Sequence, residues 1–171
     1  LAAAGHGSAP VHPRPRVVVI STGNELVEPG TPLKHGLIAD SNSMMLVAAA
    51  RASGAEAFRA GPVPDDEQRL MDTLDDQLVR ADLLVTSGGV SMGAYDTVKA
   101  VLSRLGTVEF VKVAMQPGMP QGYGTLGEQG IPIVTLPGNP VSSYVSFEVF
   151  VRPMIRRMMG YADTERPRVD A

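Results

Sequence analysis

The chain has 171 residues and a net charge of −3, with 44% hydrophobic and 19% charged residues. This length suggests one domain with a substantial core. The negative charge argues against the basic surface that nucleic-acid binding needs, and no apolar run approaches the roughly 18 residues of a membrane-spanning helix. The composition therefore predicts an ordinary globular protein that has neither nucleic acid nor membrane as a partner.

The residues that most catalytic metals and nucleophilic mechanisms require are scarce. The chain has no cysteine and only three histidines, His6, His12 and His35. A disulfide, a zinc site, a cysteine nucleophile and a Ser-His-Asp triad are therefore disfavoured. The lack of cysteine is typical of the cytoplasm. Any metal would have to be held by carboxylates, which favours a hard ion such as Mg²⁺.

The first half of the chain alternates predicted strands and helices. Residues 1–15 read as a Gly/Pro-rich linker from a removed upstream region. A β-branched run predicts a strand over 16–21, and Asp40 or Ser41 caps a helix that stops at Gly54. The other predicted elements here are a long loop over 22–36, a strand over 56–63 and a helix that opens at 64–67.

The second half continues the alternation. It contains predicted strands over 82–87, 107–115 and 131–136, helices over 97–105 and 140–159, and a glycine-rich excursion over 116–130 with room for a short antiparallel hairpin. Pro153 should kink the last helix. The pattern predicts a three-layer α/β/α domain over 16–160 with a mostly parallel sheet. Residues 161–171 are interpreted as a tail that leads to a truncated C-terminal domain.

One strand-to-helix turn, within the segment 136–148, carries the pattern of an anion site. Asn139 can cap the helix, and Pro140 suits its first position because no amide hydrogen is needed there. Ser142 and Ser143 then place hydroxyls beside backbone amides that we expect to be free to bind an anion. A well-made turn without any ligand explains the same residues equally well.

A second turn of this kind follows the predicted strand over 82–87. Gly88, Gly89 and Gly93 let a ligand approach the backbone closely, Ser87 and Ser91 offer hydroxyls, and Asp96 offers a carboxylate near the next helix. A glycine-rich loop alone is a weak signal. Two such turns in one chain indicate a site for phosphate or another anion more strongly.

Ligands of open α/β sheets bind beyond the carboxyl ends of the strands. We therefore expect the loops there, including 116–120, to form one cleft that holds three acids, Glu25, Asp40 and Asp96. Each acid also has a simpler interpretation, since Asp40 and Asp96 can cap helices and Glu25 can be a surface charge. Because phosphate and carboxylates repel unless a cation lies between them, Mg²⁺ is the expected third component.

Four motifs occur in the order found in one protein family. They are Gly-Asn-Glu-Leu-Val-Glu-Pro-Gly over 23–30, Asp-Ser-Asn over 40–42, Ser-Gly-Gly-Val-Ser-Met-Gly over 87–93 with Asp96, and Leu-Pro-Gly-Asn-Pro over 136–140. Together they resemble the molybdopterin molybdotransferase family, that is, MoeA and the gephyrin E domain. The resemblance runs from about Pro15 to Gly160 and extends only to the MogA-like domain of that larger protein.

The resemblance implies a MogA-like fold and a role in molybdenum cofactor biosynthesis. The family binds adenylylated molybdopterin and molybdate, inserts molybdenum with the help of a divalent cation such as Mg²⁺, and releases AMP. The resemblance further implies a homodimer for the full-length protein, a MogA-type adenylyltransferase as partner, and little activity for the isolated domain. Glu25, Asp40 and Asp96 match the catalytic and metal-binding acids. The implied ligand-binding residues are Thr22, Gly23, Ser87, Gly88, Gly89, Ser91, Gly93, Pro137, Gly138, Asn139, Pro140 and Ser142.

Two departures from the family pattern concern charge. Many members have lysines in the Pro-Gly loop, where this chain has Gln116 and Met119. We therefore expect a weak oxyanion subsite, or one that takes its cation from Lys112, Lys99 or another domain. Asn24 stands where many members have Asp, which removes one acid.

Two other interpretations stay open. A MogA-type adenylyltransferase shares the fold, but its glycine loop usually reads Gly-Gly-Thr-Gly, whereas this chain has Gly-Gly-Val-Ser-Met-Gly. A gephyrin-like binding module would dock a receptor peptide at a dimer surface, and the sequence carries no signal for such a peptide.

Overall fold

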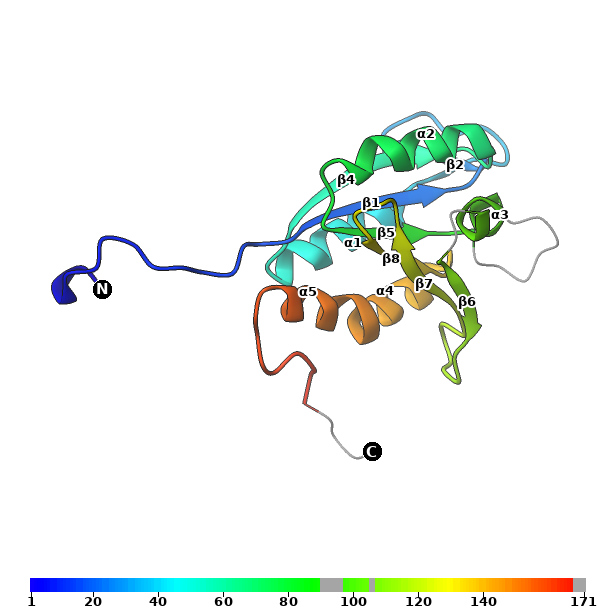
Figure 1. The fold of residues 1–171 in the computed structure, drawn as a ribbon. Coiled ribbons are helices and arrows are strands. Elements are labelled where there is room, and N and C mark those ends of the chain that lie inside the picture. The colour runs from blue at the N-terminus through cyan, green and yellow to red at the C-terminus, as the bar shows by residue number, and fades with distance from the viewer. Residues whose placement is uncertain (90–96, 105–106, 168–171) are drawn as a thin grey trace.

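The computed structural model describes residues 1–89, 97–104 and 107–167 (Figure 1). The strands of the main sheet are β1 (Arg16–Thr22), β4 (Glu56–Val63), β5 (Leu83–Ser87), β6 (Glu109–Lys112), β7 (Pro120–Leu126) and β8 (Ile131–Leu136). The helices are α1 (Ser41–Ala52), α2 (Glu67–Leu78), α3 (Thr97–Arg104), α4 (Pro140–Ser146), the π-helical η2 (Phe147–Val151) and α5 (Arg152–Met158). A short helical turn, η1 (Ala2–Ala4), lies in an exposed leader that extends away from the domain.

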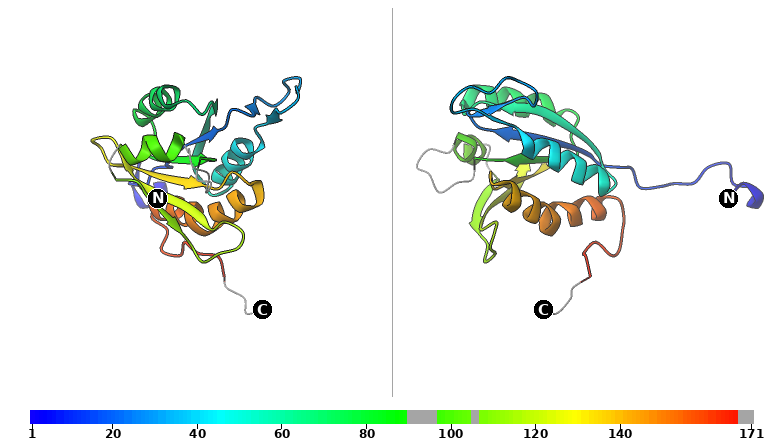
Figure 2. Two further views of the ribbon diagram at one scale, coloured as in Figure 1. Left: turned by 90° about the vertical axis from the view of Figure 1, so that its right-hand side faces the viewer. Right: turned by 180° about the vertical axis from the view of Figure 1, so that it is seen from behind.

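The six strands are ordered β4-β1-β5-β8-β7-β6. The first four are parallel to one another, and β7 is antiparallel to both of its neighbours. Helices cover both faces of this sheet (Figure 2). The predicted three-layer α/β/α architecture with a mostly parallel sheet is therefore confirmed.

Two apolar clusters fill the space between the sheet and its helices. Val17 and Val19 of β1 belong to the cluster with α1, η2 and α5, in which Phe147 is fully buried. Val18 and Ile20 face the other way, toward α2 and α3. Because successive side chains point to opposite faces, a central parallel strand must be apolar on both, which explains the continuous β-branched run.

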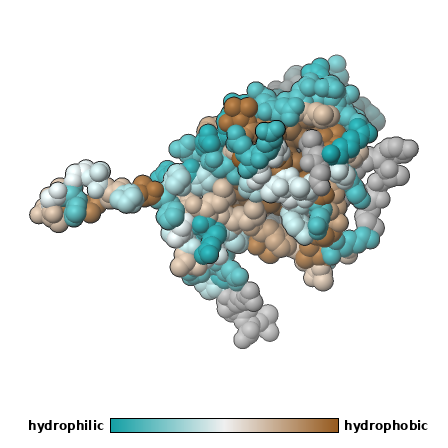
Figure 3. Space-filling model, in the orientation of Figure 1, coloured by the Kyte–Doolittle hydropathy of each residue, from teal (hydrophilic) through white to brown (hydrophobic). Residues whose placement is uncertain are grey.

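Helix α2 shows the opposite pattern, with one apolar stripe. Leu70 and Leu74 are buried, and Leu78 packs against the same cluster, because residues four apart lie on one face of a helix. The outer face of α2 forms a hydrophilic surface (Figure 3). In the described part of the chain, no helix has the length and apolar character that crossing a membrane would take.

The sheet edge differs from the prediction. The strand expected over 107–115 shortens to β6, and the excursion expected over 116–130 contains β7, a seven-residue strand of the main sheet. The sequence did not predict β7 as a strand because it contains two glycines, which are depleted in typical strands. A Cβ at Gly124 would collide with the backbone carbonyl oxygen of Thr107, so glycine is required where the chain passes this closely.

The long loop predicted over 22–36 lies within an arm that carries two very short strands, β2 (Leu26–Val27) and β3 (Ile38–Ala39), paired in parallel. Arg59 of β4 anchors this arm. Its Nη2 atom lies 3.0 Å from Glu28 Oε2 in the arm and 3.3 Å from Asp40 Oδ2 at the start of α1. These contacts hold the arm against the carboxyl edge of the sheet.

The last helix is irregular where Pro153 was predicted to kink it. The π-helical segment η2 separates α4 from α5, and the Arg152 amide donates to the Phe147 carbonyl across a wider turn. Proline has no amide hydrogen to continue the regular helical ladder. A π-turn directly before it is one way for the chain to accommodate that loss.

An ion pair at the start of β1 gives one pH-dependent prediction. Side-chain hydrogen bonds from Arg16 lower the pKa of Asp82 despite partial burial, with donor–acceptor distances of 3.0 Å and 2.8 Å. A lowered carboxyl pKa stabilises the fold above the ordinary Asp range and loses that effect as pH falls through the folded-state value. Asp82→Asn should therefore lower the melting temperature by a few degrees at most at pH 7. The difference from wild type should shrink in melts at pH values below the ordinary Asp range, and a constant difference would contradict the assignment.

Candidate functional site

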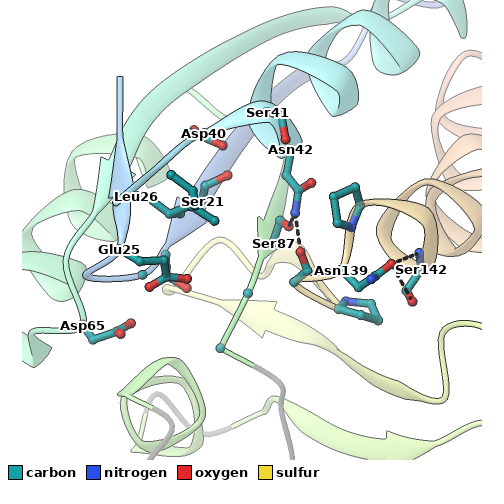
Figure 4. A pocket seen from close by; sticks show the side chains of 18 of the residues that line it. Ser21, Glu25, Leu26, Asp40, Ser41, Asn42, Asp65, Ser87, Asn139 and Ser142 are labelled. Carbon is teal, nitrogen blue, oxygen red and sulfur yellow. Dashed lines mark hydrogen bonds between the residues drawn. The ribbon is translucent and has the colours of Figure 1, made fainter. Parts of the chain in front are cut away.

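The carboxyl ends of the parallel strands open into one cavity of about 590 Å³ (Figure 4). The ends of β1 and β5 both line it. The chain leaves β1 toward β4 and leaves β5 toward the other side of the sheet, so the cavity lies where the strand order reverses. Open α/β sheets bind their ligands at this switch point. The loops after β1, β5 and β8 and the start of α1 all line this cavity, whereas the loop expected over 116–120 reaches it only through Pro120.

Most of the predicted site residues reach this cavity. Those that line it are Thr22, Gly23, Glu25, Asp40, Ser87, Gly88, Gly89, Pro137, Gly138, Asn139, Pro140 and Ser142. The predicted residues Ser91, Gly93 and Asp96 lie outside the described residues.

The cavity wall is acidic. Glu25, Asp40 and Asp65 line it, and Figure 4 shows them on the side opposite Asn139 and Ser142. No lysine, arginine or histidine occurs among the described residues that form the wall. A phosphate entering this cavity would therefore meet carboxylates without a basic side chain to offset them.

Sequence reasoning missed Asp65, which follows β4. The backbone amide of Asp65 donates to Asn24 Oδ1 at 3.0 Å, and the amide of Asn24 approaches Asp65 Oδ2 at 3.4 Å. This exchange ties the loop after β1 to the loop after β4. Asn24, read from the sequence as the loss of an acid, thus helps to place another acid at the cavity.

Asp40 is the N-cap of α1, as its simpler interpretation predicted. Its Oδ1 accepts a hydrogen bond from the Ser43 amide at 3.1 Å, while Oδ2 accepts from the Ser43 hydroxyl and lies 3.3 Å from Arg59 Nη2. The side chain is fully buried. Because both of its oxygens already accept hydrogen bonds, the Asp40 carboxylate is less available as a cation ligand than those of Glu25 and Asp65.

The predicted three-carboxylate metal site cannot be assembled from the described residues alone. Within 1–89, 97–104 and 107–167, no three His, Cys, Asp or Glu side chains are placed to hold one metal ion. Asp96, the third predicted ligand, is outside these ranges. Magnesium binding therefore stays a prediction, which the acidic wall fits because Mg²⁺ prefers oxygen ligands.

The amides at the start of α4 are not free, which corrects the prediction of an anion cradle there. Asn139 Oδ1 accepts from the amides of Val141 and Ser142 at 3.1 and 3.2 Å. The Asn139 carbonyl accepts from the Ser143 amide at 2.8 Å, and Pro140 has no amide hydrogen. The residue that starts the helix therefore also satisfies its first donors.

Asn42, at the start of α1, links the two predicted turns. Its Nδ2 atom donates to Ser87 Oγ at 2.8 Å and to the Gly138 carbonyl at 2.7 Å (Figure 4). The turn after β5 and the turn after β8 are thereby held to α1 through one amide group. The sequence pointed to Asn42 only as a member of the Asp-Ser-Asn motif.

The hairpin between β6 and β7 contributes little to the cavity. Pro120 lines it, but Gln116 and Met119 do not, and Met119 is exposed. The weak oxyanion subsite predicted at Gln116 and Met119 is therefore not part of this cavity.

Comparison with known proteins agrees with the geometry. A family model described as a probable molybdopterin binding domain matches residues 18–157. The chain is 56% identical over 172 residues to molybdopterin molybdenumtransferase 2 of Mycobacterium tuberculosis, and 47% identical over 160 residues to molybdopterin molybdenumtransferase 1 of the same species. These alignments cover 97% and 94% of this chain but 42% and 38% of the relatives, so the chain spans about two fifths of their length.

Solved structures show the same fold. The molybdopterin biosynthesis MoeA protein from Pyrococcus horikosii matches with a TM-score of 0.77 and 37% identity, over 86% of this chain and 36% of that protein. The tungsten cofactor synthesizing protein MoaB from Pyrococcus furiosus matches with a TM-score of 0.63 and 13% identity, over 88% of this chain and 98% of that protein, which shows the fold alone. The chain therefore belongs to the family of molybdopterin binding domains.

Proposed function

We propose that this chain is the molybdopterin-binding part of a molybdopterin molybdenumtransferase, and that its cavity binds adenylylated molybdopterin. The relatives carry that activity in their names, and the chain covers only part of them. The observation that carries the proposal is the acidic cavity at the carboxyl edge of the sheet, where Glu25 and Asp65 face the turns after β5 and β8. Molybdate would be the second substrate.

A magnesium ion is part of the proposal. Glu25 and Asp65 would hold it, with Asp96 as a further ligand. A bound Mg²⁺ would neutralise phosphate charge and polarise the phosphoanhydride. The chain's own contribution is to orient the ligand: Asn42 keeps the two turns in place, and the glycines at 88 and 89 let the ligand approach the backbone.

Other parts of the activity require more than this chain. We propose that the full-length protein is a cytoplasmic homodimer that receives its substrate from a MogA-type adenylyltransferase. The isolated chain should fold, because its two apolar clusters form a complete core. It should insert little molybdenum, because catalysis needs groups held close to productive geometry and most of the relatives' length is absent.

Titration with AMP in the presence and absence of Mg²⁺ tests the proposal. AMP should bind the 171-residue chain measurably more tightly with Mg²⁺, and Glu25→Gln or Asp65→Asn should each weaken the Mg²⁺-dependent binding by about tenfold, because each removes one carboxylate that faces the cation. Calorimetry measures the affinities.

Glu128→Gln is the matched control, since Glu128 is an exposed acid that does not line the cavity. It should leave the affinity unchanged. Equal losses in all three variants would point to a general charge effect and remove Glu25 and Asp65 from the site. Binding that ignores Mg²⁺ in the wild type would contradict the cation.

A further inference from the structure

Asn42 carries a buried acceptor that has no donor. Both hydrogens of its side-chain amide are engaged, because Nδ2 donates to Ser87 Oγ at 2.8 Å and to the Gly138 carbonyl at 2.7 Å. The Gly138 oxygen can only accept, so this contact fixes which end of the amide is nitrogen and where Oδ1 lies. Oδ1 is buried without a hydrogen-bond partner in the described structure, and Asn42 lines the cavity.

Other polar groups of the described cavity wall are buried and unpaired as well. Ser21, which is 1% exposed, also lines the cavity, and its hydroxyl has no hydrogen-bond partner among the described residues. Ser21 is paired in register with Ser87, which Asn42 contacts directly. Buried polar groups are nearly always hydrogen-bonded. Thr22 is a third lining residue whose hydroxyl is buried and unpaired in the described part of the chain, so Ser21, Thr22 and Asn42 together mark a place that a ligand completes.

We propose that the Asn42 carbonyl accepts a hydrogen bond from the exocyclic amino group of the heterocycle that the cavity binds, which makes Asn42 a specificity-determining residue. The inference rests on the proposed function, which supplies two such heterocycles, the pterin and adenine. A phosphate oxygen cannot fill this role because it only accepts. The base would therefore lie at Asn42, with the phosphates toward Glu25 and Asp65 across the cavity.

The test compares ligands that differ only in the amino group. AMP is paired with purine riboside 5′-monophosphate, and pterin with 4-hydroxypteridine, each titrated by calorimetry with Mg²⁺ present. In one series the wild type should prefer the amino-bearing member by about tenfold, because the analogue leaves the Asn42 acceptor buried and unpaired. The series in which the preference appears identifies the base. Asn42→Ala should reduce that preference below twofold.

The preference ratio separates a role in recognition from a role in holding the turns. Loss of the Nδ2 contacts alone would weaken both members of a pair equally and leave the ratio unchanged. Asn42→Ser is the second variant if Asn42→Ala does not fold, as judged by thermal melting, and it should show the same collapse of the ratio.

Gln121 provides a matched control. Its Nε2 atom donates to the Gly118 carbonyl and to Ser146 Oγ, and its Oε1 is also buried and unpaired, but Gln121 does not line this cavity. Gln121→Ala should lower stability and keep the preference. Tight binding by the wild type without preference in either series would overturn the inference and leave the proposed function standing. Failure of all four ligands to bind would overturn both.

Discussion

Replacing Gly88 with alanine is expected to lower the free energy of unfolding by about 3 kcal/mol or more. Gly88 has a φ of 93°, a left-handed conformation that costs other residues about 1–2 kcal/mol. The added Cβ would also lie 2.6 Å from the backbone carbonyl oxygen of Thr22, which can only move if the end of β1 moves. Such overpacking typically adds about 1–3 kcal/mol. Thermal melting should show a midpoint lower by about 10 °C.

Gly36→Ala separates the backbone strain from the collision. Gly36 has a similar φ of 83°, but nothing lies within 4 Å of the Cβ that alanine would add. It should therefore cost only about 1–2 kcal/mol. If Gly88→Ala costs no more than Gly36→Ala, the contact between Gly88 and the Thr22 carbonyl at the end of β1 is looser than the structure shows.

The central fold could be predicted because its cause is local. The three parallel strands at the centre of the sheet, β1, β5 and β8, are runs of apolar and β-branched residues that are largely buried on both faces. A glycine directly follows β1 and β5, and a Pro-Gly pair follows β8. Their carboxyl ends share one edge, so the position of the cavity followed from the alternation of elements alone. β7 escaped because Gly122 and Gly124 lack the side chains by which a strand is recognised.

The wall of the cavity depends on contacts between residues distant in sequence. Asp65 is placed by Asn24, 41 residues earlier, and Asn42 meets Gly138, 96 residues later. No local pattern encodes such pairs, because they require the register of the folded sheet. The helix caps show the opposite case, in which a local pattern predicted the structure correctly but the function drawn from it was wrong. Asn139 was correctly predicted to start α4, but a good cap satisfies the very amides that an anion site would need.

Asp40→Ala should be the second large effect, with a loss of about 3 kcal/mol. The substitution removes the N-cap of α1, which typically contributes about 1 kcal/mol. It also removes the buried carboxylate that faces Arg59, a residue with a side chain 22% exposed. Breaking one partner of a buried pair can cost about 3–5 kcal/mol. The full value is not expected here, because Arg59 keeps its contact with Glu28. Urea denaturation measures the change.

Asp66→Ala is the matched control, because Asp66 caps α2 in the same way, through a hydrogen bond of 2.8 Å from the Arg69 amide, but lies exposed. It should cost only about 1 kcal/mol. Similar losses in both variants would mean that the contact between Asp40 and Arg59 adds nothing to the cap.

Asp40→Asn then decides whether Asp40 belongs to the fold or to the cation site. Asparagine caps as well as aspartate, so this variant keeps the start of α1. It loses the charge, and its amide nitrogen replaces Oδ2, which accepts from the Ser43 hydroxyl and faces Arg59. Because that charge faces Arg59 at 3.3 Å, we expect a loss of about 1–2 kcal/mol in stability. The Mg²⁺-dependent affinity for AMP should then fall less in Asp40→Asn than in Glu25→Gln. The Glu25 carboxylate lines the cavity and is the one we propose to hold the cation. A larger fall in Asp40→Asn, with stability unchanged, would place Asp40 among the cation ligands and require Arg59 to release it when the ligand binds.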